Sequence, residues 1–146
     1  HGAVMTKSFL DCGLPSTVGV DNLAPFAKAI VNELNSTDPD LVVLELGDGI
    51  VGGYSADTVL RDREIQDSIS TLVFCASDYV GVIGGAAVLR DMGITIDVVA
   101  GSVTDSRMGE EYIERVLQLP AGNARRNGKR LFDLAFAVKD EMLLAA

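Results

Sequence analysis

Apolar residues along the chain fall into short continuous runs, and the segments between these runs have apolar positions at helical spacing. The runs at residues 41–44, 71–76 and 94–100 are typical of parallel strands that are covered on both faces. Weaker runs at 3–10 and 121–124 add a first and a last candidate strand. The intervening periodicity predicts helices at about 21–35, 55–68, 78–92, 107–117 and 128–144. This alternation predicts a doubly wound α/β fold, with a mostly parallel sheet of about four to five strands and helices on both faces.

Length and composition bound the class of protein. A chain of 146 residues, of which 48% are apolar and 23% charged, has the size of one globular domain, so we expect a single α/β domain over residues 1–146. The net charge of −9 argues against nucleic acid or a membrane surface as the main partner, because both require a cationic footprint. No apolar run reaches the roughly 18 residues of a membrane span. Cys12 and Cys75 form neither a disulfide framework nor a zinc motif, which favours a cytoplasmic location.

The beginning of the sequence, His-Gly-Ala-Val-Met, is not a translation start. Either Met5 is the native start behind an artificial leader, or the chain is a fragment of a larger domain, and we favour the fragment. A missing first strand would uncover apolar surface beside the central strands. We therefore expect a homo-oligomer.

Candidate functional residues follow the expected strands, since ligands in open α/β sheets bind outside the carboxyl ends of the strands. Five loops rich in polar side chains would converge on one rim of the sheet. Some of these side chains are expected to be helix caps or turn formers, Asp78 and Asp105 or Ser106 above all. The rim residues are Asp11, Ser16, Thr17, Glu45, Asp48, Ser77, Asp78, Ser102, Thr104, Asp105, Asn123, Arg125 and Arg126.

Glu45 is the strongest candidate for a functional residue, since it ends an apolar run and neither caps a helix nor forms a turn. A carboxylate in that position is costly unless it meets a cation. Magnesium prefers one or two carboxylates together with phosphates and water, so the predicted metal ligands are Glu45, Asp11 and Asp48. The alternative is a glutamate that is ion-paired or faces solvent.

The loop after Glu45 contains Gly47-x-Gly49-x-x-Gly52, which has the spacing of a dinucleotide-binding loop. In that motif the helix begins at the loop, so that its N-terminus faces the pyrophosphate. Here the helix is expected to start only near Ser55. A tight glycine turn is therefore the favoured interpretation.

Three segments resemble the dethiobiotin synthetase group of P-loop proteins. They are Asp40–Gly49 (DLVVLELGDG), Gly84–Ile94 after the run at 71–76, and Gly101–Asp105 after the run ending at Ala100. The resemblance implies that Glu45 helps to bind magnesium. It also places Ser102 and Thr104 where an asparagine of that group reads the adenine of ATP. The phosphate-binding motif Gly-x-x-x-x-Gly-Lys-Ser/Thr occurs nowhere in the sequence, which agrees with a fragment that lacks the upstream loop.

The sequence thus favours part of an ATP- and magnesium-dependent synthetase or ligase-like enzyme that acts on a small molecule. This part is expected to be inert without the upstream P-loop. Arg125 and Arg126 are expected to bind a carboxylate or a phosphate. The alternative is a non-catalytic module that binds a small ligand or oligomerises. An upstream P-loop in the same reading frame would favour the enzyme, and a true start at Met5 would favour the module. The predicted cofactor-binding residues are Ser16, Thr17, Ser102, Thr104, Asn123, Arg125 and Arg126.

Overall fold

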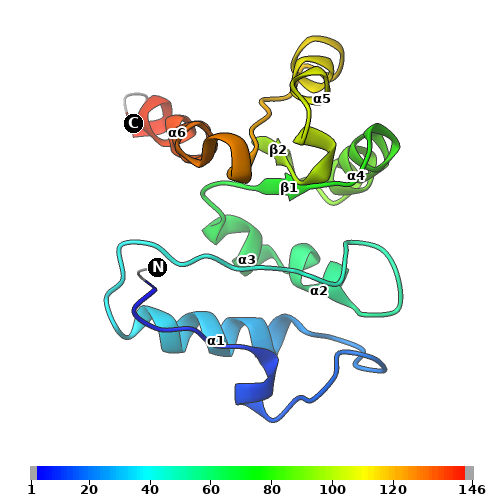
Figure 1. The fold of residues 1–146 in the computed structure, drawn as a ribbon. Helices are drawn as coiled ribbons and strands as arrows, with labels where there is room; N and C mark the ends of the chain where they lie inside the picture. Colours follow the sequence, from blue (N-terminus) through cyan, green and yellow to red (C-terminus); the bar gives the residue numbers. More distant parts are fainter. Residues whose placement is uncertain (1–2, 144–146) are drawn as a thin grey trace. The chain divides into compact units, whose positions relative to one another are not determined.

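The computed structural model describes the backbone of residues 3–143 and the side chains as far as Phe136. The chain divides into two compact units, 1–68 and 69–146, each of which is described by itself (Figure 1). About 51% of the chain is helical. Among the described residues, no helix is both long enough and apolar enough to cross a membrane.

The first unit is built from three α-helices and a short 3-10 helix. These are η1 (Phe9–Cys12), α1 (Ala24–Asn35), α2 (Ala56–Arg61) and α3 (Arg63–Ser68). The core residues are Leu23, Ala24, Ala27, Ile30, Ala56, Val59, Leu60 and Ile65. The start of α1 is fixed by Thr58 of α2, whose hydroxyl accepts a hydrogen bond from the backbone N–H of Leu23 at 2.9 Å. Lys28 of α1 lies 3.1 Å from both Asp62 and Glu64, which ties α1 to the junction between α2 and α3.

The segment from 39 to 54 connects α1 to α2 without regular secondary structure. Its apolar residues are largely exposed: Leu41 is 45%, Val43 78% and Leu44 41% exposed. Gly49 and Gly52 have φ values of 80° and 130°, in the region that only glycine adopts readily. The loop therefore turns sharply before α2 begins at Ala56, as the sequence predicted for this glycine-rich stretch.

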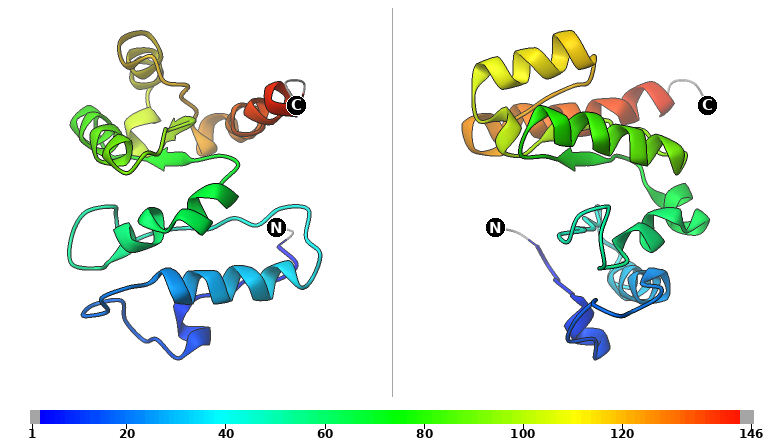
Figure 2. Two further views of the ribbon diagram at one scale, coloured as in Figure 1. Left: turned by 180° about the vertical axis from the view of Figure 1, so that it is seen from behind. Right: turned by 90° about the vertical axis from the view of Figure 1, so that its right-hand side faces the viewer.

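The second unit contains the sheet, which consists of two parallel strands, β1 (Val73–Cys75) and β2 (Val98–Ala100). Ala121 extends the sheet by a single parallel bridge to Val99. Helix α4 (Tyr79–Asp91) connects β1 to β2. Strand β2 is followed by η2 (Ser102–Thr104), α5 (Arg107–Tyr112), the π-helical segment η3 (Ile113–Leu117) and α6 (Ala124–Leu143). The two long helices, α4 and α6, flank the strand pair on opposite sides (Figure 2). The expected helix end at residue 144 lies outside the described residues.

Helix α4 packs closely on β1 because it has a glycine at the contact. Gly85 is buried, and a Cβ atom added there would overlap the ring of Phe74 on β1. Asp78 caps this helix by accepting a hydrogen bond from the N–H of Gly81 at 2.7 Å, which confirms the cap that the sequence predicted. The central strand β2 is completely buried, whereas Val73 and Cys75 of β1 are exposed.

The expected doubly wound sheet of four to five strands is wrong. Residues 3–10 form no strand, because Ser8 and Asp11 make a capping box that favours the 3-10 helix η1. The run at 41–44 has no ladder partner in the described residues, and its expected burial is also wrong. The run at 121–124 is reduced to one bridge, since Pro120 has no N–H and Asn123 already caps a helix. Of the three main apolar runs, only the one at 94–100 has the expected burial, at Ile96, Val98, Val99 and Ala100.

The contact between Gly85 and Phe74 can be tested with a pair of neighbouring substitutions. Gly84 is exposed and has open space around it, so Gly84→Ala should stabilise the protein by about 0.5–1 kcal/mol. Gly85→Ala should destabilise it by about 1–3 kcal/mol, because the new methyl group displaces the Phe74 ring. Urea unfolding of both variants measures the difference. Equal midpoints for the two variants would contradict this packing.

Candidate functional site

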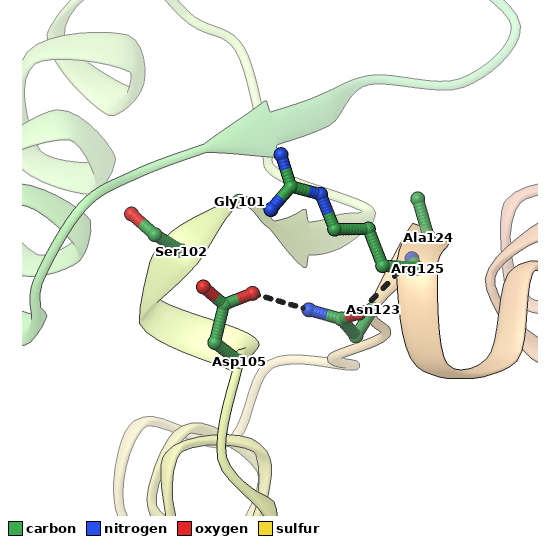
Figure 3. Close-up of a pocket in the computed structure, with 6 residues that line it drawn as sticks. All are labelled: Gly101, Ser102, Asp105, Asn123, Ala124 and Arg125. Carbon is green, nitrogen blue, oxygen red and sulfur yellow. Dashed lines mark hydrogen bonds between the residues drawn. The ribbon is translucent and has the colours of Figure 1, made fainter.

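A pocket lies in the second unit at the carboxyl ends of β2 and of the bridge at Ala121 (Figure 3). This is the edge of a parallel sheet at which ligands commonly bind. Its volume is about 200 Å³. The pocket is lined by Gly101, Ser102, Asp105, Asn123, Ala124 and Arg125.

Gly101 forms the floor of the pocket, where β2 turns into η2. Its φ and ψ are 91° and −171°, and an added Cβ would lie 2.6 Å from the carbonyl oxygen of Ala76. Only glycine fits both conditions. The same Ala76 oxygen accepts a hydrogen bond from the N–H of Val103 at 3.1 Å. The loops that follow β1 and β2 are therefore held directly against each other.

Asn123 joins the loop after β2 to the start of α6, and it is 3% exposed. Its Oδ1 accepts hydrogen bonds from the N–H groups of Arg125 at 3.0 Å and Arg126 at 2.8 Å. Its Nδ2 donates to Asp105 Oδ1 at 2.9 Å and to Thr104 Oγ1 at 3.2 Å. The amide thus uses both its oxygen and its nitrogen within the protein. Asn123 positions the site rather than contacting a ligand.

Thr104 is completely buried, and its hydroxyl donates to the carbonyl of Gly101 at 2.7 Å. This hydroxyl lies inside the protein, behind the wall of the pocket. The sequence grouped Thr104 with Ser102 as ligand-binding residues. The structure brings them together in η2, but only Ser102 lines the pocket, and in Figure 3 its hydroxyl points away from Asp105 and Arg125.

Arg126 is occupied by an ion pair between helices. Its guanidinium pairs with Glu110 of α5, whose side chain is only 10% exposed. Beyond a break in α6 at Asn127, whose φ of −154° and ψ of 73° are not helical, Arg130 pairs with Glu114. The two ion pairs hold the two parts of α6 against α5 and η3.

Arg125 is the cation that faces the pocket. Its side chain is exposed and extends from the start of α6 toward Gly101 (Figure 3). Within the described part of the chain, its guanidinium takes part in no hydrogen bond or ion pair. Asp105 also borders the pocket and has one carboxylate oxygen hydrogen-bonded to the Asn123 amide. The pocket therefore presents one guanidinium and one carboxylate oxygen that are available to a ligand.

The sequence left open whether Asp105 or Ser106 caps α5. Ser106 is the cap, since its hydroxyl accepts a hydrogen bond from the N–H of Gly109 at 3.0 Å. A helix has only one N-cap residue. The succession of two capping residues, Asp105 and Ser106, was the signal that one of them serves another purpose.

The remaining predicted residues lie in the first unit. Thr17 donates a hydrogen bond to Asp48 at 3.2 Å, and Ser16 accepts one from the N–H of Val18. The backbone N–H and the hydroxyl of Ser8 hydrogen-bond to Asp11 and hold the pKa of that carboxyl below its ordinary value. Glu45 is exposed, and its carboxylate lies near Gly47.

A metal ion would require several of these carboxylates to converge. Among the described residues, no three His, Cys, Asp or Glu side chains are grouped closely enough to hold one. Asp11, Glu45 and Asp48 as arranged do not fit magnesium by themselves, so we derive no chemical step through a metal. The metal assignment stays a prediction from the sequence.

Comparison with known proteins gave no match: no protein-family model, no curated protein and no solved structure is significantly similar to the chain. The resemblance to the dethiobiotin synthetase group therefore also stays a prediction.

The role of Asn123 can be measured against Asn127, which caps the second part of α6 by accepting one hydrogen bond from the N–H of Arg130. Asn123→Ala removes a cap and two buried donor contacts, so it should cost about 2–3 kcal/mol of unfolding free energy. Asn127→Ala removes one exposed cap and should cost about 1 kcal/mol or less. Chemical denaturation of both variants provides the comparison. If the two losses are equal, Asn123 has no special role.

Proposed function

We propose that the second unit binds a small anionic ligand, a carboxylate or a phosphate, in the pocket between Asp105 and Arg125. We further propose that this pocket belongs to a nucleotide-dependent synthetase or ligase-like enzyme. The sequence assigned Ser102, Asn123 and Arg125 to the nucleotide, whereas here we propose that their pocket holds the small molecule on which the enzyme acts.

One observation carries the anion-binding proposal, which is the contrast between two neighbouring arginines. Arg126 is neutralised by Glu110, whereas Arg125 faces the pocket with its guanidinium available. A guanidinium can donate two parallel hydrogen bonds to a carboxylate or a phosphate. The formal net charge of −9 repels anions from the protein as a whole. Anion binding must therefore depend on a local cation such as Arg125.

The N-terminus of α6 contributes little by itself to this proposal. The N–H groups of Arg125 and Arg126 are already bound to Asn123 Oδ1 and are not directed at a ligand. The side chain of Arg125 is thus the group on which binding should depend.

The nucleotide part of the proposal rests on the resemblance to the dethiobiotin synthetase group. No Gly-x-x-x-x-Gly-Lys-Ser/Thr motif is present in the 146 residues, so a phosphate cradle of that kind would have to come from outside this sequence. We accordingly propose that the chain is inert alone. The same pocket also supports the alternative, a ligand-binding module without catalysis. Activity that appears only when an upstream P-loop segment is supplied would favour the enzyme.

A titration of the purified chain with propyl phosphate and with butyrate, followed by NMR shifts of backbone amides, tests the anion site. Arg125→Gln should weaken binding of the preferred anion about tenfold or more, because it removes the only proposed cation. Arg107→Gln is the matched control, since Arg107 loses the same charge in the same unit and pairs only with Glu111 on the exposed surface. Unchanged affinity in Arg125→Gln, or no saturable shift at Gly101 and Asn123, would refute the site.

We also propose that the protein self-associates, as the sequence suggested. Leu41, Val43 and Leu44 expose apolar side chains along one extended segment, and such surfaces favour association. Light scattering over a concentration series should show dimers or larger species. Val43→Lys should shift the association to higher concentration, while Val18→Lys, at another exposed valine of the same unit, should leave it unchanged. A monomer at all concentrations would contradict this proposal.

A further inference from the structure

Two opposite charges line the pocket without neutralising each other. Arg125 and Asp105 both border it, and no ion pair within 4.0 Å joins them in the described structure. In the same unit, four other acidic and basic pairs do make such contacts: Arg107 with Glu111, Arg126 with Glu110, Arg130 with Glu114, and Lys129 with Asp133.

Hydrogen bonds from its surroundings hold Asp105 in place. Its Oδ1 accepts from Asn123 Nδ2 at 2.9 Å, and its backbone N–H donates to the carbonyl of Ser102 at 3.0 Å. Asn123 is itself fixed by the first turn of α6. The second carboxylate oxygen, Oδ2, keeps its capacity to accept a hydrogen bond. A ligand therefore meets a fixed acceptor at Asp105 and a guanidinium beside Gly101 (Figure 3).

We infer that the pocket selects a dipolar ligand, which carries an anionic group for Arg125 and an ammonium group for Asp105. The inference rests on the proposed function, because it names the class of ligand for the same pocket. A simple anion would bind Arg125 but would be repelled by Asp105. A simple cation would bind Asp105 but would be repelled by Arg125. A ligand with both charges satisfies both residues at once.

Arg125 and Asp105 border one pocket of about 200 Å³, and both are hydrogen-bonded to the same side chain, that of Asn123. One small molecule can therefore reach both charged groups, so the ligand class is a short amino acid or amino phosphate, with two or three carbon atoms between its charged groups. No covalent step is part of the inference.

Two probes of equal length separate the dipolar ligand from a plain anion. Phosphoethanolamine and propyl phosphate differ by an ammonium in place of a terminal methyl group. The pair β-alanine and butyrate repeats the comparison for a carboxylate and decides which anionic group is preferred. Binding of all four to the full chain is measured by the same NMR titration. We expect the ammonium-bearing member of the preferred pair to bind about tenfold more tightly, as a charge-assisted hydrogen bond would give.

Asp105→Asn tests the residue without removing its structural contact, since an amide oxygen can still accept the hydrogen bond from Asn123. This variant should lose the tenfold preference and bind the plain anion at least as well as the wild type does. Glu111→Gln is the matched control, because it removes one acidic charge from the exposed surface of the same unit, outside the pocket, and it should keep the preference. A thermal melt of each variant verifies that the fold is retained.

The outcomes separate this inference from the proposed function. If plain and dipolar anions bind equally well and Arg125→Gln weakens both, the anion site stands and the dipolar inference is overturned. If a tenfold preference persists in Asp105→Asn, the ammonium is bound elsewhere and the inference is also overturned. If none of the four probes binds, the proposed function fails, and the inference fails with it.

Discussion

The second unit depends on the hydrogen bonds of one buried side chain, the amide of Asn123. A parallel strand pair needs its connecting loops to be held together at the carboxyl edge, because the strands themselves are only three residues long. Asn123 does this by binding η2 through Thr104 and Asp105 and by capping α6. An amide is suited to this position, since it offers acceptor and donor groups on one short side chain. An aspartate there would lack the donor and would face Asp105 with a like charge.

The helices were largely predictable from the sequence, and the sheet was not. Helix α4 begins at its capping residue Asp78 as expected, since a cap and a helical repeat are both local properties. The expected helix at 55–68 is broken at Asp62, whose ψ of 119° leaves the helical region. A strand requires a partner that may be far away in the sequence. The apolar run at 41–44 shows this difference, because its sequence resembles the run at 94–100 but it has no ladder partner in the described structure.

The residues near the candidate site were predictable from the sequence, but the directions of their side chains were not. Ser102, Asp105, Asn123 and Arg125 follow neighbouring strand ends, so the rule for parallel sheets groups them correctly. The sequence does not reveal which of the grouped side chains turn inward. Thr104 and Asn123 are buried, and their side chains hydrogen-bond within the protein. The sequence does not show this, because burial and hydrogen-bond partners depend on the three-dimensional structure. Asp11 is a second example of a predicted site residue with a structural role. Its carboxylate accepts a hydrogen bond from the backbone N–H of Ser8, and this local contact competes with metal binding.

The separation of roles between Arg125 and Arg126 follows from helix geometry. Consecutive residues of an α-helix differ in direction by about 100°, so two adjacent side chains cannot both face the same neighbour. The Asn123 cap fixes where the first part of α6 begins, and the ion pair with Glu110 fixes the direction of Arg126. Arg125 must then point away from α5. It lies at the end of the sheet, where Gly101 leaves the pocket open. The ion pairs that dock α6 therefore also determine which arginine is available to a ligand.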